Sequence, residues 1–121
     1  MITGLRTVSY PVKDLAAAKA WYAAVLERPP YFDEAFYVGF EVGGFELGLL
    51  PDGEPGAAGA TAFWGTSGIE ADIERIAALG ATVASPLTDV GGGIRVVSLR
   101  DPDGNLFGLI DNPHFDLAKV R

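Results

Sequence analysis

Hydrophobic and polar residues alternate along the start of the chain and then switch to a helical spacing. Val8, Tyr10 and Val12 alternate with polar or proline positions across residues 5–12, and this period of two predicts a strand covered on one face. From Asp14, a good N-cap residue, apolar residues recur at helical spacing until a pair of prolines ends the run. The chain therefore opens with a strand followed by a helix.

Two apolar, aromatic-rich runs come next, at residues 36–42 and 45–50. Gly43-Gly44 between them predicts a two-residue hairpin, because both central positions of that turn need φ > 0. A shorter strand is expected at residues 31–33. Residues 51–59 are rich in glycine and proline and lack periodicity, so we expect a connector there.

The same order of patterns returns after the connector. Residues 61–66 predict a strand, and Ser67-Gly68-Ile69-Glu70 has the spacing of a capping box that opens a helix. Gly80 fits the position just after that helix, where a left-handed residue closes the last turn. Three further strands are expected, at residues 81–90, 94–100 and 106–111.

The two halves agree in spacing as well as in order. Thr7 and Asp14 correspond to Thr61 and Gly68, an offset of about 54 residues in both cases. In the last strands, residues 45–47 correspond to residues 107–109, so Glu46 is matched with Gly108. We therefore predict an α+β fold of two tandem βαβββ modules within one domain. The predicted limits are about 4–52 for the first module and 58–115 for the second, with a linker at about 51–59.

Composition and charge narrow the class of protein. The chain has 121 residues, 49% hydrophobic and 21% charged, which is typical of one soluble globular domain. Its formal net charge of −7 would repel a phosphate backbone, so nucleic acid is not an expected partner. We see neither an apolar run long enough to span a bilayer nor a leader sequence, so we expect no membrane association and a cytoplasmic protein.

The scarcity of soft metal ligands excludes several chemistries. The sequence has no Cys and one His, His114. Thiolate zinc sites, iron–sulfur clusters, cysteine nucleophiles and sites with several histidines are therefore excluded within one chain. His114 follows the last predicted strand, where we expect a solvated or capping residue.

Three stretches together carry a family resemblance. They are residues 8–22, the end of the second helix at residues 79–81, and above all Asp101-Pro102-Asp103-Gly104-Asn105 before the last strand. In this order they resemble the vicinal-oxygen-chelate superfamily of glyoxalases, extradiol dioxygenases, fosfomycin resistance proteins and bleomycin-binding proteins. The resemblance covers about residues 5–115. It implies the glyoxalase/bleomycin resistance fold, with curled mixed sheets around a cleft, and a homodimer.

The resemblance also implies where a metal would be held. In metal-dependent members the ligands lie on the first and last strand of each module, which correspond here to Thr7, Glu46, Thr61 and Gly108. Only Glu46 is a common ligand type, since threonine hydroxyls are weak ligands and glycine offers no side chain. We therefore expect a member that lacks the metal, and we expect no cofactor.

Glu46 is the candidate functional residue of the first half. Strand alternation places Glu46 and Gly48 opposite Leu47, so Glu46 would point into the cleft as a tentative acid/base or as a binder of a cationic group. The alternative is an ordinary charge, or a partner of Arg95 or Arg6. Aromatic residues expected near the cleft walls are Tyr31, Phe32, Tyr37, Phe40, Phe63 and Trp64. The candidate ligand-binding residues are Thr7, Ser9, Tyr37, Glu46, Gly48, Thr61, Phe63, Arg95 and Gly108.

Three functions remain open from the sequence. The first is a metal-free protein that binds a small organic molecule, aromatic or cationic, for sequestration or resistance, as bleomycin-binding members do. The second is a lyase, isomerase or dioxygenase-like enzyme that uses Glu46 as acid/base and Arg95 as an oxyanion donor. The third is a non-catalytic regulatory or interaction subunit. A homodimer is expected in each case.

Overall fold

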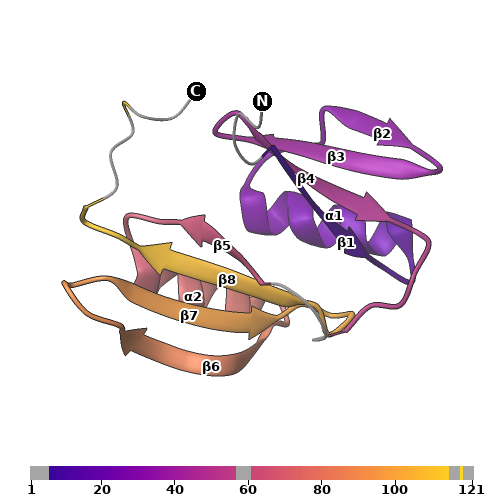
Figure 1. The fold of residues 1–121 in the computed structure, drawn as a ribbon. Coiled ribbons are helices and arrows are strands. Elements are labelled where there is room, and N and C mark those ends of the chain that lie inside the picture. The colour runs from indigo at the N-terminus through magenta and orange to yellow at the C-terminus, as the bar shows by residue number, and fades with distance from the viewer. Residues whose placement is uncertain (1–5, 57–60, 115–117, 119–121) are drawn as a thin grey trace. The chain divides into compact units, whose positions relative to one another are not determined.

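The computed structural model describes residues 6–56, 61–114 and 118, which form two compact units. The first unit spans Met1–Ala58 with Pro102–Asn105, and the second spans Gly59–Asp101 with Leu106–Arg121. Each unit contains one helix and a four-stranded mixed sheet (Figure 1). The predicted α+β class with two βαβββ modules is therefore confirmed. No helix among the described residues is long and apolar enough to cross a membrane.

The first unit follows the order predicted for a βαβββ module. Its strands are paired in the order β1-β4-β3-β2, with β1 and β4 parallel and the other neighbours antiparallel. Gly43 and Gly44 have φ of 60° and 89° and join β3 to β4, as the hairpin prediction required. The elements are β1 (Thr7–Pro11), α1 (Leu15–Leu26), β2 (Phe32–Glu34), β3 (Tyr37–Val42) and β4 (Phe45–Leu50).

Helix α1 packs its apolar side on one face of this sheet. Asp14 caps it by accepting a hydrogen bond from the Ala17 backbone N–H at 3.1 Å, as predicted. The helix ends at Glu27, which adopts the left-handed conformation with φ 57°. The buried residues that form this core are Tyr10, Val12, Ala18, Tyr22, Val25, Val38, Phe40, Leu47 and Leu49.

The second unit repeats the arrangement with a longer meander. Its strands are paired in the order β5-β8-β7-β6, again with the first pair parallel. Its core comprises Ile69, Ile76, Ala81, Val97, Leu99, Phe107 and Leu109. The elements are β5 (Ala62–Gly65), α2 (Ile69–Ala78), β6 (Thr82–Asp89), β7 (Arg95–Arg100) and β8 (Leu106–Asp111).

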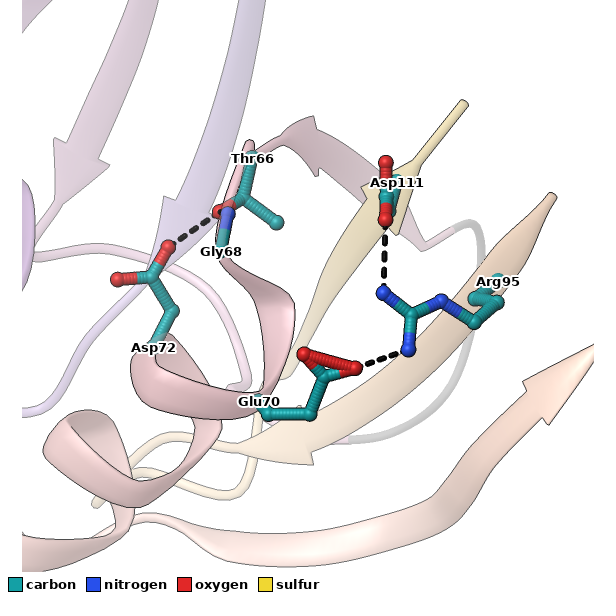
Figure 2. Close-up of polar contacts among 6 residues, drawn as sticks. All are labelled: Thr66, Gly68, Glu70, Asp72, Arg95 and Asp111. Carbon is teal, nitrogen blue, oxygen red and sulfur yellow. Dashed lines mark hydrogen bonds and ion pairs between the residues drawn. The ribbon is translucent and has the colours of Figure 1, made fainter. Parts of the chain in front are cut away.

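The start of α2 differs from the predicted capping box. The N-cap is Gly68, which has no side chain to accept a hydrogen bond, and Ser67 does not take that role. Instead Thr66 Oγ1 accepts from the Gly68 backbone N–H at 3.0 Å and donates to the Asp72 carboxylate (Figure 2). The N-cap is therefore one residue later than the predicted Ser67, and it makes no side-chain capping hydrogen bond. The end is as predicted, with Gly80 at φ 107°.

The turn between β7 and β8 makes its contacts within the first unit. Gly104 has φ 85°, the left-handed conformation predicted for this turn. The buried Asn105 side chain donates to the Pro11 carbonyl at 2.7 Å and accepts from the Gly56 backbone N–H at 2.9 Å. Asp103 accepts from the Lys13 backbone N–H at 3.2 Å. These contacts explain why the turn residues belong to the first unit, although they join two strands of the second.

Candidate functional site

The five predicted site residues of the first unit share one face of its sheet. The register pairs Thr7 with Glu46 and Ser9 with Gly48. Leu47 is buried on the face covered by α1, so strand alternation places its neighbours Glu46 and Gly48 on the opposite face. We call this surface the Glu46 face; it comprises Thr7, Ser9, Phe32, Tyr37, Gly39, Glu46 and Gly48.

The Glu46 carboxylate receives hydrogen bonds from two phenols. Tyr31 donates its hydroxyl to Glu46 Oε1, and Tyr37 donates its hydroxyl to Glu46 Oε2. The backbone also fixes Glu46, because its N–H donates to the Arg6 carbonyl at 2.8 Å. Each carboxylate oxygen thus has one neutral donor, and further lone pairs of both oxygens stay available to another donor.

Two glycines make room for these aromatic rings. Gly39 and Gly48 are opposite one another on β3 and β4. A Cβ added at Gly48 would lie 2.6 Å from Tyr37 Cζ, and one added at Gly39 would lie 3.2 Å from Glu46 Oε1. The Tyr37 ring therefore lies directly over Gly48, which explains how Tyr37 reaches Glu46 from the neighbouring strand.

Aromatic side chains extend from this carboxylate toward the edge strand β2. The ring of Phe32 lies 5.9 Å from that of Tyr37 and 6.0 Å from that of Phe36, both in edge-to-face geometry. Tyr31 is 64% exposed and Phe36 is 66% exposed, which is unusual for such large side chains. The row of rings and the carboxylate form one accessible surface. Phe40, which we expected in a cleft wall, is instead fully buried on the side of α1.

The corresponding face of the second unit lacks a charged group at the matched position. Phe63 is 48% exposed and lies over Gly108, where an added Cβ would be 2.5 Å from Phe63 Cδ1. The register pairs Phe63, not Thr61, with Gly108. In the first unit Thr7 pairs with Glu46. The repeat matched Thr7 with Thr61 and Glu46 with Gly108, so Thr61 should have paired with Gly108. The observed partner, Phe63, is two residues further along, so the two matches are inconsistent by two residues. Trp64, which we expected near a cleft wall, is half-buried and stacks on the buried Phe107 with 6.0 Å between the ring centroids.

Arg95 does not face the side on which a ligand was expected. On β7, Arg95 is in the same alternation as the buried residues Val97 and Leu99, so it lies on their face, which α2 covers. Its guanidinium donates to Asp111 Oδ2 at 2.8 Å and to the Glu70 carboxylate (Figure 2). The hydrogen bonds to Asp111 and Glu70 raise the pKa of Arg95, and the hydrogen bond from Arg95 lowers the pKa of Glu70. Arg95 therefore ties α2 to the sheet through these two carboxylates.

His114 lies at the end of the second unit. Its Nε2 is 2.7 Å from the Gly92 carbonyl, and its backbone N–H donates to Asn112 Oδ1 at 2.9 Å. These contacts hold the segment after β8 to the glycine-rich loop before β7. The side chain is exposed, at a position where we expected a solvated or capping residue.

The residues at the family's metal positions do not fit a divalent ion. Among the described residues, no group of three or more His, Cys, Asp or Glu lies close enough together to hold a metal. Glu46 already accepts from two phenols, its partner Thr7 offers a neutral hydroxyl, and Gly108 is covered by Phe63. A divalent cation needs several strong oxygen or nitrogen donors, which this set does not supply.

Sequence reasoning found Glu46 but missed its hydrogen-bond partners. Tyr31 was expected only as an aromatic wall, because it precedes β2 and its position depends on the β2–β3 pairing. Phe36 was not predicted as a site residue at all. The signal that was available is the density of aromatic residues between 31 and 37, which exceeds what a three-residue edge strand needs for its core.

Comparisons with known proteins agree with this fold. A genomically encoded fosfomycin resistance protein from Listeria monocytogenes superposes with a TM-score of 0.75 at 22% identity, covering 94% of this chain and 97% of the other. A glyoxalase-related enzyme from Fulvimarina pelagi gives 0.76 at 18% identity, covering 93% and 90%. A glyoxalase/bleomycin resistance protein from Catenulispora acidiphila gives 0.69 at 24% identity, covering 91% and 100%. These likenesses establish the fold.

Sequence comparison gives the family. No curated protein sequence matches the chain significantly. The family profile described as Glyoxalase/Bleomycin resistance protein/Dioxygenase superfamily matches residues 4–109, most of the chain. With its two βαβββ units, the chain belongs to the glyoxalase/bleomycin resistance protein/dioxygenase superfamily.

Proposed function

We propose that this protein binds a small organic molecule on the Glu46 face, through a cationic group at the Glu46 carboxylate, and that it does so without a metal. The observation that carries the proposal is the Glu46 carboxylate, which two phenols hold in place at the end of a row of exposed aromatic rings. Such a surface offers one anionic anchor and apolar walls, which suit a ligand with one cationic and one aromatic part.

Charge supports a cationic ligand. The chain carries a formal charge of −7, and Glu41 lies directly opposite Glu46 on the neighbouring strand. The Glu41 carboxylate accepts from the Gly44 backbone N–H at 2.6 Å, so it stays at the turn while adding negative charge to the same region. A cation approaching Glu46 would meet an attractive potential.

The direct test is titration calorimetry with benzylamine, and with benzyl alcohol as a neutral molecule of the same shape. Glu46→Gln should weaken benzylamine binding about 10- to 100-fold, because it replaces a charge-assisted hydrogen bond by a neutral one, and should leave benzyl alcohol unaffected. Glu41→Gln is the matched control, since it removes the same formal charge from the neighbouring strand. Equal affinity of the wild type and Glu46→Gln for benzylamine would remove Glu46 from the proposal.

The metal-free part of the proposal has its own test. We expect the purified protein to contain no stoichiometric metal and its melting temperature to stay constant when nickel, zinc, manganese or iron(II) is added, with a chelator control. A shift of several degrees would mean that a metal binds the folded state and would return a metal-dependent enzyme to first place.

The enzymatic alternative now has less support. It needed Arg95 as a donor to a developing oxyanion, and Arg95 is bound to Glu70 and Asp111 on the face covered by α2. Without Arg95, a developing oxyanion beside Glu46 would depend on the hydroxyls of Tyr31 and Tyr37 as hydrogen-bond donors. A homodimer and a cytoplasmic location stay predictions, and sedimentation velocity would test the first of them.

A further inference from the structure

The two phenols that hold Glu46 differ in their surroundings. Tyr37 is half-buried, its ring is confined between Phe32 and the backbone at Gly48, and it donates to Oε2. Tyr31 donates to Oε1 from a side chain that is 64% exposed. Its backbone is fixed by the hydrogen bond from its N–H to the Gly39 carbonyl at 3.0 Å. One phenol is therefore held by packing, whereas the other can rotate into solvent without leaving a cavity.

From this asymmetry we infer that a bound ligand's N–H group displaces the Tyr31 hydroxyl from Glu46 Oε1. The Tyr37 hydroxyl stays bound to Oε2 and positions the carboxylate. The inference rests on the proposed function. It also narrows the ligand class to organic cations that carry an N–H, such as primary and secondary ammonium groups.

The exchange is favourable on general grounds. In the hydrogen bond from a phenol to a carboxylate, only the acceptor is charged. In the hydrogen bond from an ammonium group, donor and acceptor carry opposite charges, so their attraction adds to the hydrogen bond. Tyr31 is exposed, so after leaving Glu46 its hydroxyl donates a hydrogen bond to water, which offsets much of the loss. In the absence of a ligand, the Tyr31 hydroxyl donates to Glu46 Oε1, which would otherwise need a water molecule as its donor, so the Glu46 carboxylate stays ordered.

Steric crowding at Gly39 favours exchange over simple addition. A Cβ added at Gly39 would be 3.3 Å from Tyr31 Cε1 and 3.3 Å from Tyr37 Cε2, as well as 3.2 Å from Glu46 Oε1. The two rings and the carboxylate therefore converge over this residue. A ligand atom that approaches Oε1 from the exposed side meets the Tyr31 ring first.

The experiment compares Tyr31→Phe with Tyr37→Phe in titrations with benzylamine, benzyltrimethylammonium and benzyl alcohol. Tyr31→Phe should bind benzylamine about two- to tenfold more tightly than the wild type, because a competing hydrogen bond is gone. Tyr37→Phe should bind it about two- to tenfold more weakly, with benzyl alcohol unaffected. Benzyltrimethylammonium, which has no N–H, should bind more weakly than benzylamine and should not distinguish wild type from Tyr31→Phe.

A spectroscopic signature separates exchange from a structural effect. Benzylamine should change the near-ultraviolet absorption of tyrosine in the wild type and in Tyr37→Phe, and this change should be absent in Tyr31→Phe. Weaker benzylamine binding by Tyr31→Phe, or an undiminished tyrosine signal in that variant, would overturn the exchange while leaving the proposed function intact. Absence of benzylamine binding by the wild type would overturn the proposed function, and the exchange with it.

Discussion

Each unit places an aromatic ring over a glycine of its last strand, β4 or β8, but only the ring in the first unit carries a polar group. In the first unit Tyr37 covers Gly48 from the antiparallel neighbour β3, and its hydroxyl reaches Glu46. In the second unit Phe63 covers Gly108 from the parallel neighbour β5. The packing is comparable, whereas the chemistry differs.

The contact between a ring and a glycine is therefore a structural feature of both sheets. A candidate site arises only where the ring carries a hydroxyl and has an acidic neighbour. Glu70 in the second unit also has a polar partner, but there the partner is Arg95 and the result is an ion pair beside α2. The first unit therefore presents its carboxylate with neutral donors, and the second uses its carboxylates to fix a helix.

Alanine at the two glycines should give the largest effect and should separate the units. A Cβ at Gly108 would lie 2.8 Å from the Ala62 carbonyl oxygen, a backbone atom that cannot rotate away, so Gly108→Ala should cost about 2 to 3 kcal/mol of unfolding free energy. At Gly48 the three nearest atoms all belong to the Tyr37 side chain, and Gly48→Ala should cost about 1 kcal/mol. Urea denaturation measures both. Equal losses would show that backbone contact does not distinguish the two positions.

Asn105 tests whether the turn stabilises the first unit. Asn105→Ala would leave the Pro11 carbonyl and the Gly56 N–H without their partner in a buried place, so it should cost about 1 to 3 kcal/mol. Hydrogen exchange should show the loss in β1 and not in α2. Asp103→Ala is the control, because the Asp103 contact to Lys13 is exposed and should contribute little. Faster exchange in α2 alone would contradict the assignment of this turn to the first unit.

A reciprocal pair of hydroxyl changes sharpens the comparison between the rings. Tyr37→Phe removes the hydrogen bond to Glu46 and should cost about 1 kcal/mol. Phe63→Tyr adds a hydroxyl to a half-exposed ring in the second unit and should change stability by less than about 0.5 kcal/mol. Thermal melts give both values. A larger loss for Phe63→Tyr than for Tyr37→Phe would mean that ring packing, not the phenol hydroxyl, dominates on both faces.

The smallest effect is expected from the ion pair, and it depends on pH. The hydrogen bond from Arg95 lowers the pKa of Glu70, so the folded state binds this proton more weakly than the unfolded state does. The pair therefore stabilises the fold at pH above the ordinary range for glutamate, about 4, and the contribution is lost as the pH falls through the lowered value. Because both groups are on the surface, the effect should be small.

The measurement for this pair is the difference in melting temperature between the wild type and Glu70→Gln. The difference should be largest near neutral pH and should decrease toward zero in acid. Glu74→Gln, on the same helix, is the control for the loss of one carboxylate from α2. A difference that stays constant across the acid range would show that Glu70 acts through packing and not through its charge.

Much of the fold could be predicted because its signals are local. The Gly43-Gly44 hairpin, the Asp14 cap, the left-handed Gly80 and Gly104, and both modules depend on residues close together in the sequence. The predicted limits of β4 and β8 agree with those observed, since alternation extends over each whole strand. The capping box of α2 was wrong, because the N-cap is Gly68 and not Ser67, and both residue types are acceptable at that position.

By itself, the sequence determined the fold family, the parity that places Glu46 away from α1, and the shortage of metal ligands. The tertiary structure alone decided which partners those side chains have. Tyr31 and Tyr37 reach Glu46, and Phe63 rather than Thr61 is opposite Gly108, because strand register sets these neighbours. Strand register also places Arg95, a candidate ligand-binding residue, beside Asp111, and it forms ion pairs with Asp111 and Glu70. Register depends on contacts between residues far apart in the chain, which local patterns do not encode.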